Sequence, residues 1–240
     1  MTAAFHVQPE NITYSIGLGK SERVNDKIYT VFRDCFFNEF HHIHCPSNFI
    51  ANELKEHGYT AKLHVISNGI EDDWKYKKTE KPGSLKDKIV ITMVGRLSGE
   101  KRQDVLIDAV KQSKYADKIQ IIFAGKGPKR RTYQKLGEQL KNQPIFEFCE
   151  KEKLQNILAY TDLYVHTSDA EIEAISCIEA IATGLVPIIA KSDKSATSQF
   201  ALDERSTFEA GNSKELSEKI DYWLENTEER KRMELEYAQN

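Results

Sequence analysis

The chain has 240 residues, and its 34 Lys and Arg against 37 Asp and Glu give a formal net charge of −3, which is not the basic balance expected of a nucleic-acid-binding protein. Hydrophobic residues make up 40% of the sequence and charged residues 30%, so the chain can bury a sizeable core and global disorder is disfavoured. The apolar runs are too short to cross a bilayer, no secretory signal pattern is visible, and the four cysteines lie far apart, so we expect a cytoplasmic protein with reduced thiols.

The first 70 residues alternate short apolar strands with helices and are predicted to form a partial Rossmann-like domain. Ser21 and Ser47 are candidate N-caps, and Pro9 is expected to turn the chain after the first strand. Since a domain seldom opens on a strand with no unit before it, we expect this first domain, residues 1–70, to be incomplete. Its predicted elements, in chain order, are a strand at 2–7, a helix at 21–40, a strand at 41–46, a helix at 47–59 and a strand at 62–70.

Residues 71–87 are charged and show no apolar period, which predicts a linker. A second, regular series follows, with predicted strands at 88–95, 118–125, 145–149, 163–168, 185–192 and 207–212 and predicted helices at 102–113, 130–141, 152–161, 176–184 and 213–226. Apolar strands that alternate with helices favour a parallel sheet covered on both faces. Residues 88–226 are therefore predicted to be a doubly wound α/β domain, followed by a charged C-terminal helix at 227–240.

Two cations lie in the loop that follows the predicted strand at 88–95. Arg96 and Lys101 are five residues apart, and in a doubly wound domain such a loop faces the ligand crevice. Arg offers a fork of donors and Lys a point charge, a pair suited to phosphate oxygens. The alternative interpretation is a solvated basic loop without a ligand.

Two carboxylates follow the predicted strand at 163–168. Glu171 precedes the next helix, and Glu179 lies inside that helix within an apolar run, where a carboxylate needs hydrogen-bond donors. Paired ligand hydroxyls would supply these donors, and the free backbone N–H groups near Ile175 and Ser176 would favour a phosphate. The alternative interpretation is a capping carboxylate and an exposed helical glutamate.

His6 ends the first predicted strand, where a histidine can donate to a substrate oxygen or stabilise developing charge, although a lone histidine is more often structural.

Other signals are weaker. The run 17–21 ends like a phosphate-binding loop, but Tyr14 stands at the position of its first glycine, and 125–128 lacks the third glycine of a dinucleotide fingerprint. The strand at 41–45 offers at most two metal ligands per face, so we expect no metal there.

Several motifs together resemble one known family. G-R-L-x-x-x-K at 95–101 and E-x7-E at 171–179, followed by A-I-A-T-G-L-V-P at 180–187, resemble the retaining glycosyltransferases of family 4, whose GT-B fold has two Rossmann-like domains that face a cleft. Further segments resemble the membrane-associated branch that glucosylates lipids, and they lie at 6–13, 42–54, 65–71, 171–190 and 194–202. Many relatives have Gly-Phe-Gly where this chain has residues 172–174 (Ile-Glu-Ala).

The resemblance implies UDP-glucose as the donor, held by the second domain without a metal or another cofactor. Arg96 and Lys101 match the pair that grips the donor diphosphate, and Glu179 matches the carboxylate that accepts the ribose hydroxyls. Glu171 matches the residue that meets the donor hexose, although Glu173 leaves open which carboxylate meets the sugar.

The same resemblance puts the amides near Ile175 and Ser176 at a donor phosphate and His6 at the donor sugar and the reacting centre. Glucose would pass with retention to a membrane lipid hydroxyl, with cholesterol or another sterol as the first candidate and diacylglycerol as the alternative. The protein would be a retaining hexosyltransferase that is cytoplasmic and peripherally associated with the inner face of the membrane.

Three other functions stay open. With its first domain incomplete, the chain could be a UDP-sugar-binding module without turnover. The Phe-rich helix at 21–40 could touch lipid and make the chain a peripheral membrane adaptor, although core packing also explains those rings. A NAD-dependent enzyme is disfavoured by the missing glycine fingerprint.

Overall fold

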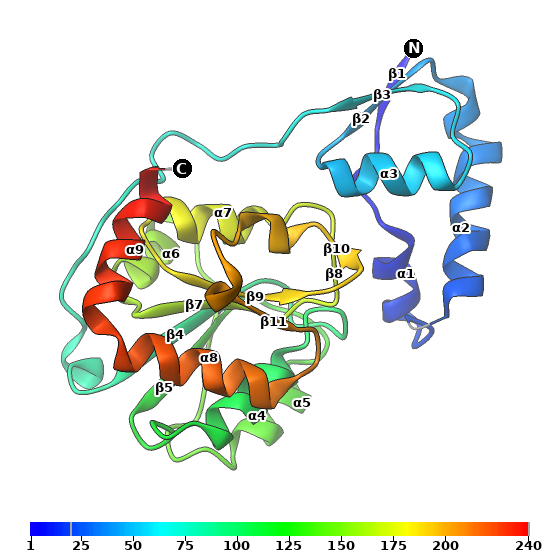
Figure 1. Ribbon diagram of the computed structural model, residues 1–240. Coiled ribbons are helices and arrows are strands. Elements are labelled where there is room, and N and C mark those ends of the chain that lie inside the picture. The colour runs from blue at the N-terminus through cyan, green and yellow to red at the C-terminus, as the bar shows by residue number, and fades with distance from the viewer. Residues whose placement is uncertain (20, 240) are drawn as a thin grey trace.

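Two main parallel sheets joined by a long connecting segment, together with a third sheet of two short strands, make up the computed structural model, which describes residues 1–19 and 21–239 (Figure 1). The smaller sheet has the order β1-β2-β3, with β1 at Thr2–Ala4, β2 at His42–Cys45 and β3 at Lys62–Val65. The helices beside it are α1 (Pro9–Ser15), α2 (Glu22–Cys35) and α3 (Asn48–Glu56). We call residues 1–65 the first lobe and residues 89–239 the second lobe.

Aromatic side chains fill the core of the first lobe. Side chains alternate along a strand, so β2 turns Ile43 and Cys45 into this core and leaves its histidines on the other face. The predicted helix at 21–40 is divided, because α2 ends at Cys35 and a 3-10 turn follows at Phe37–Glu39. The turn buries Phe37 and leaves Phe36 53% exposed. The rings that pack together include Phe5, Tyr29, Phe37 and Tyr59.

Serine and proline positions mark where the first-lobe helices begin. Ser47 caps α3, because its side-chain oxygen accepts a hydrogen bond from the backbone N–H of Ile50 at 3.3 Å. Ser21 stands at the N-cap of α2, as predicted, but its side chain makes no capping hydrogen bond. Pro9 opens α1 rather than a simple turn, a position that suits its missing N–H.

The larger sheet has six strands in the order β11-β9-β7-β4-β5-β6. The strands in chain order are β4 (Ile89–Val94), β5 (Ile119–Ala124), β6 (Ile145–Glu147), β7 (Leu163–His166), β9 (Pro187–Lys191) and β11 (Thr207–Glu209). Counted along the chain, this is the order 3-2-1-4-5-6 of a doubly wound fold, so the predicted α/β fold is confirmed. The order reverses between β4 and β7, and the loops after these two strands flank the crevice where such folds bind ligands.

Helices cover both faces of the larger sheet (Figure 1). One face packs Ile91 and Met93 against α4 and α8, whereas the other face packs Val90 against Ile157 of α6. A short sheet of β8 (Ala170–Glu171) and β10 (Lys194–Ser195) lies near α1 of the first lobe. The helices of the second lobe are α4 (Gln103–Gln112), α5 (Arg130–Gly137), α6 (Lys151–Tyr160), α7 (Ile175–Ala182), α8 (Ser213–Glu225) and α9 (Thr227–Gln239).

The connecting segment at 66–88 and the helix α9 both pack against the second lobe. Trp74 of the segment is buried, and Lys81 Nζ forms an ion pair with Asp162 at 2.5 Å. The charged helix α9 buries Met233 and Tyr237. The segment predicted as a linker is therefore held in place along much of its length. None of the helices in the described part of the chain is long and apolar enough to span a bilayer.

Two glycines after β5 let two loops at the crevice approach each other closely. A Cβ at Gly125 would lie 1.9 Å from the carbonyl oxygen of Gly95, and a Cβ at Gly127 would lie 2.3 Å from the carbonyl oxygen of Leu97. Both contacts are to backbone, so no flexible side chain can move aside. The glycines at 125 and 127 thus serve loop packing, which explains their presence without a dinucleotide fingerprint.

We predict that Gly125→Ala lowers the free energy of unfolding by about 2 kcal/mol or more, because the added methyl group overlaps the Gly95 carbonyl. Gly83→Ala is the matched control, since among the described residues a Cβ there meets nothing within 4 Å. Urea unfolding of both variants and the wild type measures the difference. A Gly125→Ala protein as stable as the wild type would contradict the close approach of the two loops.

Candidate functional site

A cavity of about 260 Å³ opens where the first lobe meets the loops that follow β4 and β7. We call it the Glu171 cavity. Five of the residues predicted from the sequence to form a site lie in its lining: His6, Lys101, Glu171, Ile175 and Ser176. Two residues that the sequence did not single out, Asn11 of α1 and Asn68 of the connecting segment, also line this cavity. Residues from distant parts of the chain therefore meet at the predicted crevice.

Glu171 is buried and keeps its charge through two partners. Lys101 Nζ forms an ion pair with Glu171 Oε1, and His166 Nε2 lies 3.0 Å from the same oxygen. Burial alone would raise the pKa of Glu171, but the charge of Lys101 and the hydrogen bonds from His166 and Lys101 outweigh burial and hold this pKa well below its usual range. The carboxylate is therefore ionised at neutral pH. The sequence did not predict that Lys101 and Glu171 bind each other.

His166 belongs to this site and was missed from the sequence. It is the last residue of β7 and is fully buried. Its Nδ1 atom lies 3.2 Å from the hydroxyl of Tyr164, which donates a hydrogen bond to Ser176 Oγ at 3.3 Å. Polar contacts thus link Glu171, through His166 and Tyr164, to Ser176 in the first turn of α7. A signal was present, because a histidine that ends an apolar strand of a doubly wound sheet lies at the crevice.

The start of α7 presents backbone donors to the Glu171 cavity. Ile175 and Ser176 are the first two helical residues, so their amides have no acceptor within the helix. Ala174, immediately before them, has a left-handed backbone with a φ of 63°, which disfavours residues other than glycine. Strained backbone of this kind is found at ligand-binding turns more often than elsewhere.

A second cavity of about 710 Å³ lies between the loops that follow β4, β5 and β6, and we call it the Arg96 cavity. Arg96 lines it together with Phe148 and Leu154. The Arg96 side chain is exposed and has no ion-pair partner among the described residues. Ser176 lines the Glu171 cavity and donates to the carbonyl of Val94, which lines the Arg96 cavity, at 3.3 Å. The two cavities therefore adjoin at this contact.

Glu179 lies farther along α7 and is half-buried. Its carboxylate has no hydrogen-bond or ion-pair partner in the described part of the chain, and the linings of the two cavities do not include it. Burial raises the pKa of Glu179 to about 7, against a smaller lowering by the charge of Lys151 and with a further raise from Glu71. A carboxylate in this position has free acceptor capacity for donors from a ligand.

Glu173 is engaged by the connecting segment. Its carboxylate accepts hydrogen bonds from the backbone N–H of Asn68 at 3.1 Å and from Asn68 Nδ2 at 2.6 Å. Glu173 is buried, as Glu171 is, but only Glu171 contacts Lys101. Of the two carboxylates between which the sequence left a choice, Glu171 is therefore the one that lies beside a predicted ligand-binding cation.

The histidines of β2 contact the neighbouring strand and its continuation. His42 Nδ1 lies 2.9 Å from His64 Nε2, and His44 Nε2 lies 2.6 Å from the carbonyl oxygen of Ile66. Within residues 1–19 and 21–239, no group of three or more His, Cys, Asp or Glu side chains is placed to hold a metal ion. The weak metal signal at 41–45 thus corresponds to side-chain contacts on one face of the small sheet.

A protein-family model described as Glycosyl transferases group 1 matches residues 75–239. The solved catalytic domain of cholesterol-alpha-glucosyltransferase from Helicobacter pylori is 50% identical in sequence to this chain. The match covers 63% of this chain and 96% of that chain, and its TM-score is 0.59. Anabaena Alr3699/HepE in complex with UDP and glucose is 20% identical, with 99% of this chain and 65% of that chain covered and a TM-score of 0.79. The second likeness concerns the fold alone, and together they confirm the predicted GT-B fold.

Two curated proteins are also similar. Alpha-monoglucosyldiacylglycerol synthase from Streptococcus pneumoniae is 25% identical over 204 residues, which are 78% of this chain and 45% of that protein. The GPI3 subunit of phosphatidylinositol N-acetylglucosaminyltransferase from Saccharomyces cerevisiae is 31% identical over 136 residues, which are 50% of this chain and 30% of that protein. The chain thus spans less than half of the length of either relative.

The raised pKa of Glu179 predicts a stability change that depends on pH. The pKa rises from 4.5 in the unfolded chain to about 7 in the folded chain. Between pH 4.5 and pH 7 the folded protein therefore binds more protons than the unfolded chain does. Its free energy of unfolding consequently falls as the pH rises through this range. Glu179→Gln removes the ionisation. We expect the variant to match the wild type near pH 4.5 and to exceed it at pH 8 by about 1–2 kcal/mol, a value reduced for solvent screening.

Urea unfolding at both pH values measures this difference. The exposed Glu138→Gln, on the helical turn after α5, is the control for loss of one negative charge. An equal effect of Glu179→Gln at the two pH values would show that the carboxyl titrates outside this range.

Proposed function

The chain belongs to the group 1 glycosyl transferase family, and from that membership we propose that it transfers glucose from UDP-glucose to the hydroxyl of a membrane lipid with retention of configuration. Cholesterol is the first candidate acceptor, because the match to the Helicobacter pylori cholesterol-alpha-glucosyltransferase domain has 50% identity. Diacylglycerol is the second candidate, because of the 25% identical monoglucosyldiacylglycerol synthase. A UDP-sugar-binding module without turnover is the remaining alternative.

The observation that carries the proposal is the meeting of His6, Lys101 and Glu171 around one cavity at the switch point of the larger sheet. A cation, a carboxylate and a histidine at this edge suit a sugar attached to a diphosphate. The cation neutralises phosphate charge, and the carboxylate accepts sugar hydroxyls. His6 faces them from the first lobe.

Donor binding follows from the two adjoining cavities. Phe148 and Leu154 give the Arg96 cavity apolar walls that suit a nucleobase, and its volume of about 710 Å³ accommodates a nucleoside. The diphosphate then lies between Arg96, Lys101 and the amides at the start of α7. Glu179 accepts the ribose hydroxyls in this arrangement.

The chemical step requires stabilisation of negative charge on the departing UDP. Arg96 and Lys101 supply fixed positive charge where that charge develops, which lowers the barrier more than it strengthens ground-state binding. Glu171 holds the hexose while the acceptor hydroxyl attacks from the face that the leaving group vacates. The two glutamates are not assigned the acid and nucleophile roles of a glycosidase pair.

An apolar cavity favours a lipid as the acceptor. This cavity, which we call the Phe cavity, has a volume of about 350 Å³ and is lined by Phe32, Phe36 and Phe37 of the first lobe. His6 lines both the Phe cavity and the Glu171 cavity. An acceptor with an apolar body and one hydroxyl group can therefore fill the Phe cavity while its hydroxyl reaches His6. Such an acceptor also implies peripheral association with a membrane surface.

Calorimetric titration with UDP-glucose in EDTA tests donor binding. We expect saturable binding that Glu179→Ala weakens by about 2 kcal/mol, since the ribose hydroxyls then lose their acceptor. Arg96→Ala should reduce turnover more than binding, because charge on UDP grows in the transition state. Glu138→Ala is the control. A folded chain that binds no UDP-glucose would refute the donor assignment.

A transfer assay with lipid vesicles tests the acceptor. Vesicles that contain cholesterol or diacylglycerol are compared, and Phe36→Ala should lower kcat/KM for the acceptor by about fivefold through lost apolar contact while UDP affinity stays constant. Leu235→Ala, an exposed apolar position on α9 with 52% exposure, is the matched control. UDP-glucose binding without sugar transfer to either lipid would favour the binding module.

A further inference from the structure

The helix α1 (Pro9–Ser15) is fastened to the second lobe at both ends. Before its start, Gln8 Nε2 donates a hydrogen bond to the carbonyl oxygen of Lys194 at 3.0 Å. Near its end, the hydroxyl of Tyr14 donates to Asp169 Oδ2 at 2.7 Å. Asn11 lies between these two contacts and lines the Glu171 cavity. The placement of Asn11 against the second lobe therefore depends on the two flanking bonds.

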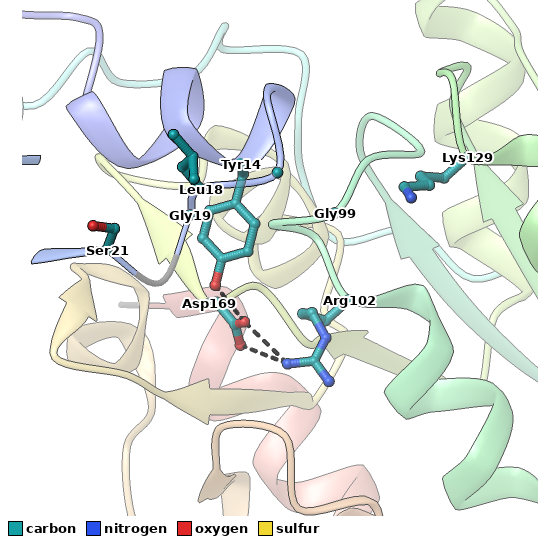
Figure 2. A pocket seen from close by; sticks show the side chains of 9 residues that line it. Tyr14, Leu18, Gly19, Ser21, Gly99, Arg102, Lys129 and Asp169 are labelled. Atoms are coloured by element: carbon teal, nitrogen blue, oxygen red, sulfur yellow. Dashed lines mark hydrogen bonds and ion pairs between the residues drawn. The ribbon is translucent and has the colours of Figure 1, made fainter. Parts of the chain in front are cut away.

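Tyr14 contacts the same two second-lobe segments that hold the Lys101–Glu171 pair. Figure 2 shows its hydroxyl pointing to Asp169, whose carboxylate also binds Arg102 Nη1 at 3.0 Å. Arg102 follows Lys101 in the chain, and Asp169 precedes Glu171 by two residues. The ion pairs Arg102–Asp169 and Lys101–Glu171 thus link the same loops side by side. The Tyr14 hydroxyl joins the first lobe to this arrangement.

The backbone around these pairs is also cross-linked. The amide of Asp169 donates to the carbonyl of Glu100 at 2.8 Å, and the hydroxyl of Thr167 donates to the carbonyl of Lys101 at 2.8 Å. A change at the Asp169 carboxylate therefore leaves the loops connected through these two hydrogen bonds, neither of which uses that carboxylate. The Tyr14 contact can be removed while the second-lobe framework stays in place.

The ring of Tyr14 is packed closely enough to fix its hydroxyl. A Cβ at Gly19 would lie 2.4 Å from Tyr14 Cγ, and a Cβ at Gly99 would lie 3.5 Å from Tyr14 Cδ1. Glycine at 19 thus lets its own loop cover the ring, which explains part of the glycine-rich run seen in the sequence. Burial, together with the hydrogen bond to Asp169, raises the pKa of Tyr14, so the phenol stays protonated and can donate.

We propose that Tyr14 is a positioning residue for the sugar end of the donor. Its hydroxyl bond to Asp169 holds α1 in place, so that Asn11, like His6, lines the same cavity as the Lys101–Glu171 pair. The nucleotide end of the donor contacts the second lobe and does not depend on α1. This inference rests on the proposed UDP-sugar donor and adds the first-lobe element that recognises its sugar.

The test compares UDP with UDP-glucose in one variant. Tyr14→Phe keeps the packed ring and removes only the hydroxyl group. We expect it to bind UDP within twofold of the wild type and to bind UDP-glucose about fivefold more weakly, because only the sugar meets residues that α1 carries. Tyr76→Phe is the matched control, since the Tyr76 hydroxyl has no hydrogen-bond partner in the described part of the chain and the residue is 46% exposed.

A double-mutant cycle assigns the effect to the contact. Asp169→Ala removes the acceptor of this hydrogen bond. The double variant should lower the ratio of UDP-glucose affinity to UDP affinity by no more than either single variant does. Equal weakening of UDP and UDP-glucose by Tyr14→Phe would overturn the proposal, since the hydroxyl would then act on overall stability. Additive losses in the double variant would also overturn it.

A measurement without nucleotide separates this inference from the proposed function. Hydrogen exchange of the apo chain should be faster at the amides of α1 in Tyr14→Phe than in the wild type and in Tyr76→Phe. If the wild type binds neither UDP nor UDP-glucose, the proposed donor is wrong, and the exchange rates alone decide whether Tyr14 positions α1. Unchanged exchange in Tyr14→Phe would reject that role.

Discussion

A buried carboxylate at the edge of the larger sheet is the constraint around which the site is organised. Glu171 lies in a low-dielectric environment where an unpaired charge is strongly disfavoured, so its ionised form depends on Lys101 and His166. These partners come from the loop after β4 and from the end of β7, the two strands between which the sheet order reverses. The ion pair therefore fixes the two loops that border the crevice and defines where a ligand can lie.

Three contacts from the first lobe and the connecting segment converge on one short stretch of the second lobe, residues 169–173. Tyr14 binds Asp169, the hydroxyl of Ser47 donates to the carbonyl of Ile172 at 2.7 Å, and Asn68 binds Glu173. The first lobe and the connecting segment thus hold 169–173, which Lys101 also contacts through Glu171. Together with the hydrogen bond from Gln8 to the carbonyl oxygen of Lys194, these contacts join the first lobe and the connecting segment to the second lobe.

The sequence predicted the features that depend on local residue patterns, but it did not predict contacts between residues that are far apart in the chain. Apolar periodicity identified the alternating strands and helices of the second lobe. The candidate residues Arg96, Lys101 and Glu171 were predicted in the segments that follow β4 and β7. It could not show that Lys101 binds Glu171, because the two are 70 positions apart and either could have met solvent or a ligand. It missed α1 because Pro9 is equally suited to a turn and to the first position of a helix. It also missed His166, whose role follows from burial beside Glu171 and not from any motif.

The pairing of Lys101 with Glu171 has a consequence for which anions the site accepts. The lysine charge is already satisfied by Glu171, so an incoming phosphate must compete with a carboxylate that is held in place. Inorganic phosphate or a simple nucleotide that draws Lys101 away leaves Glu171 buried with His166 as its remaining partner. A ligand that carries hydroxyl groups next to its phosphate replaces the donor that Glu171 loses. Under the proposed function, the pair would therefore disfavour common cellular anions and favour sugar phosphates.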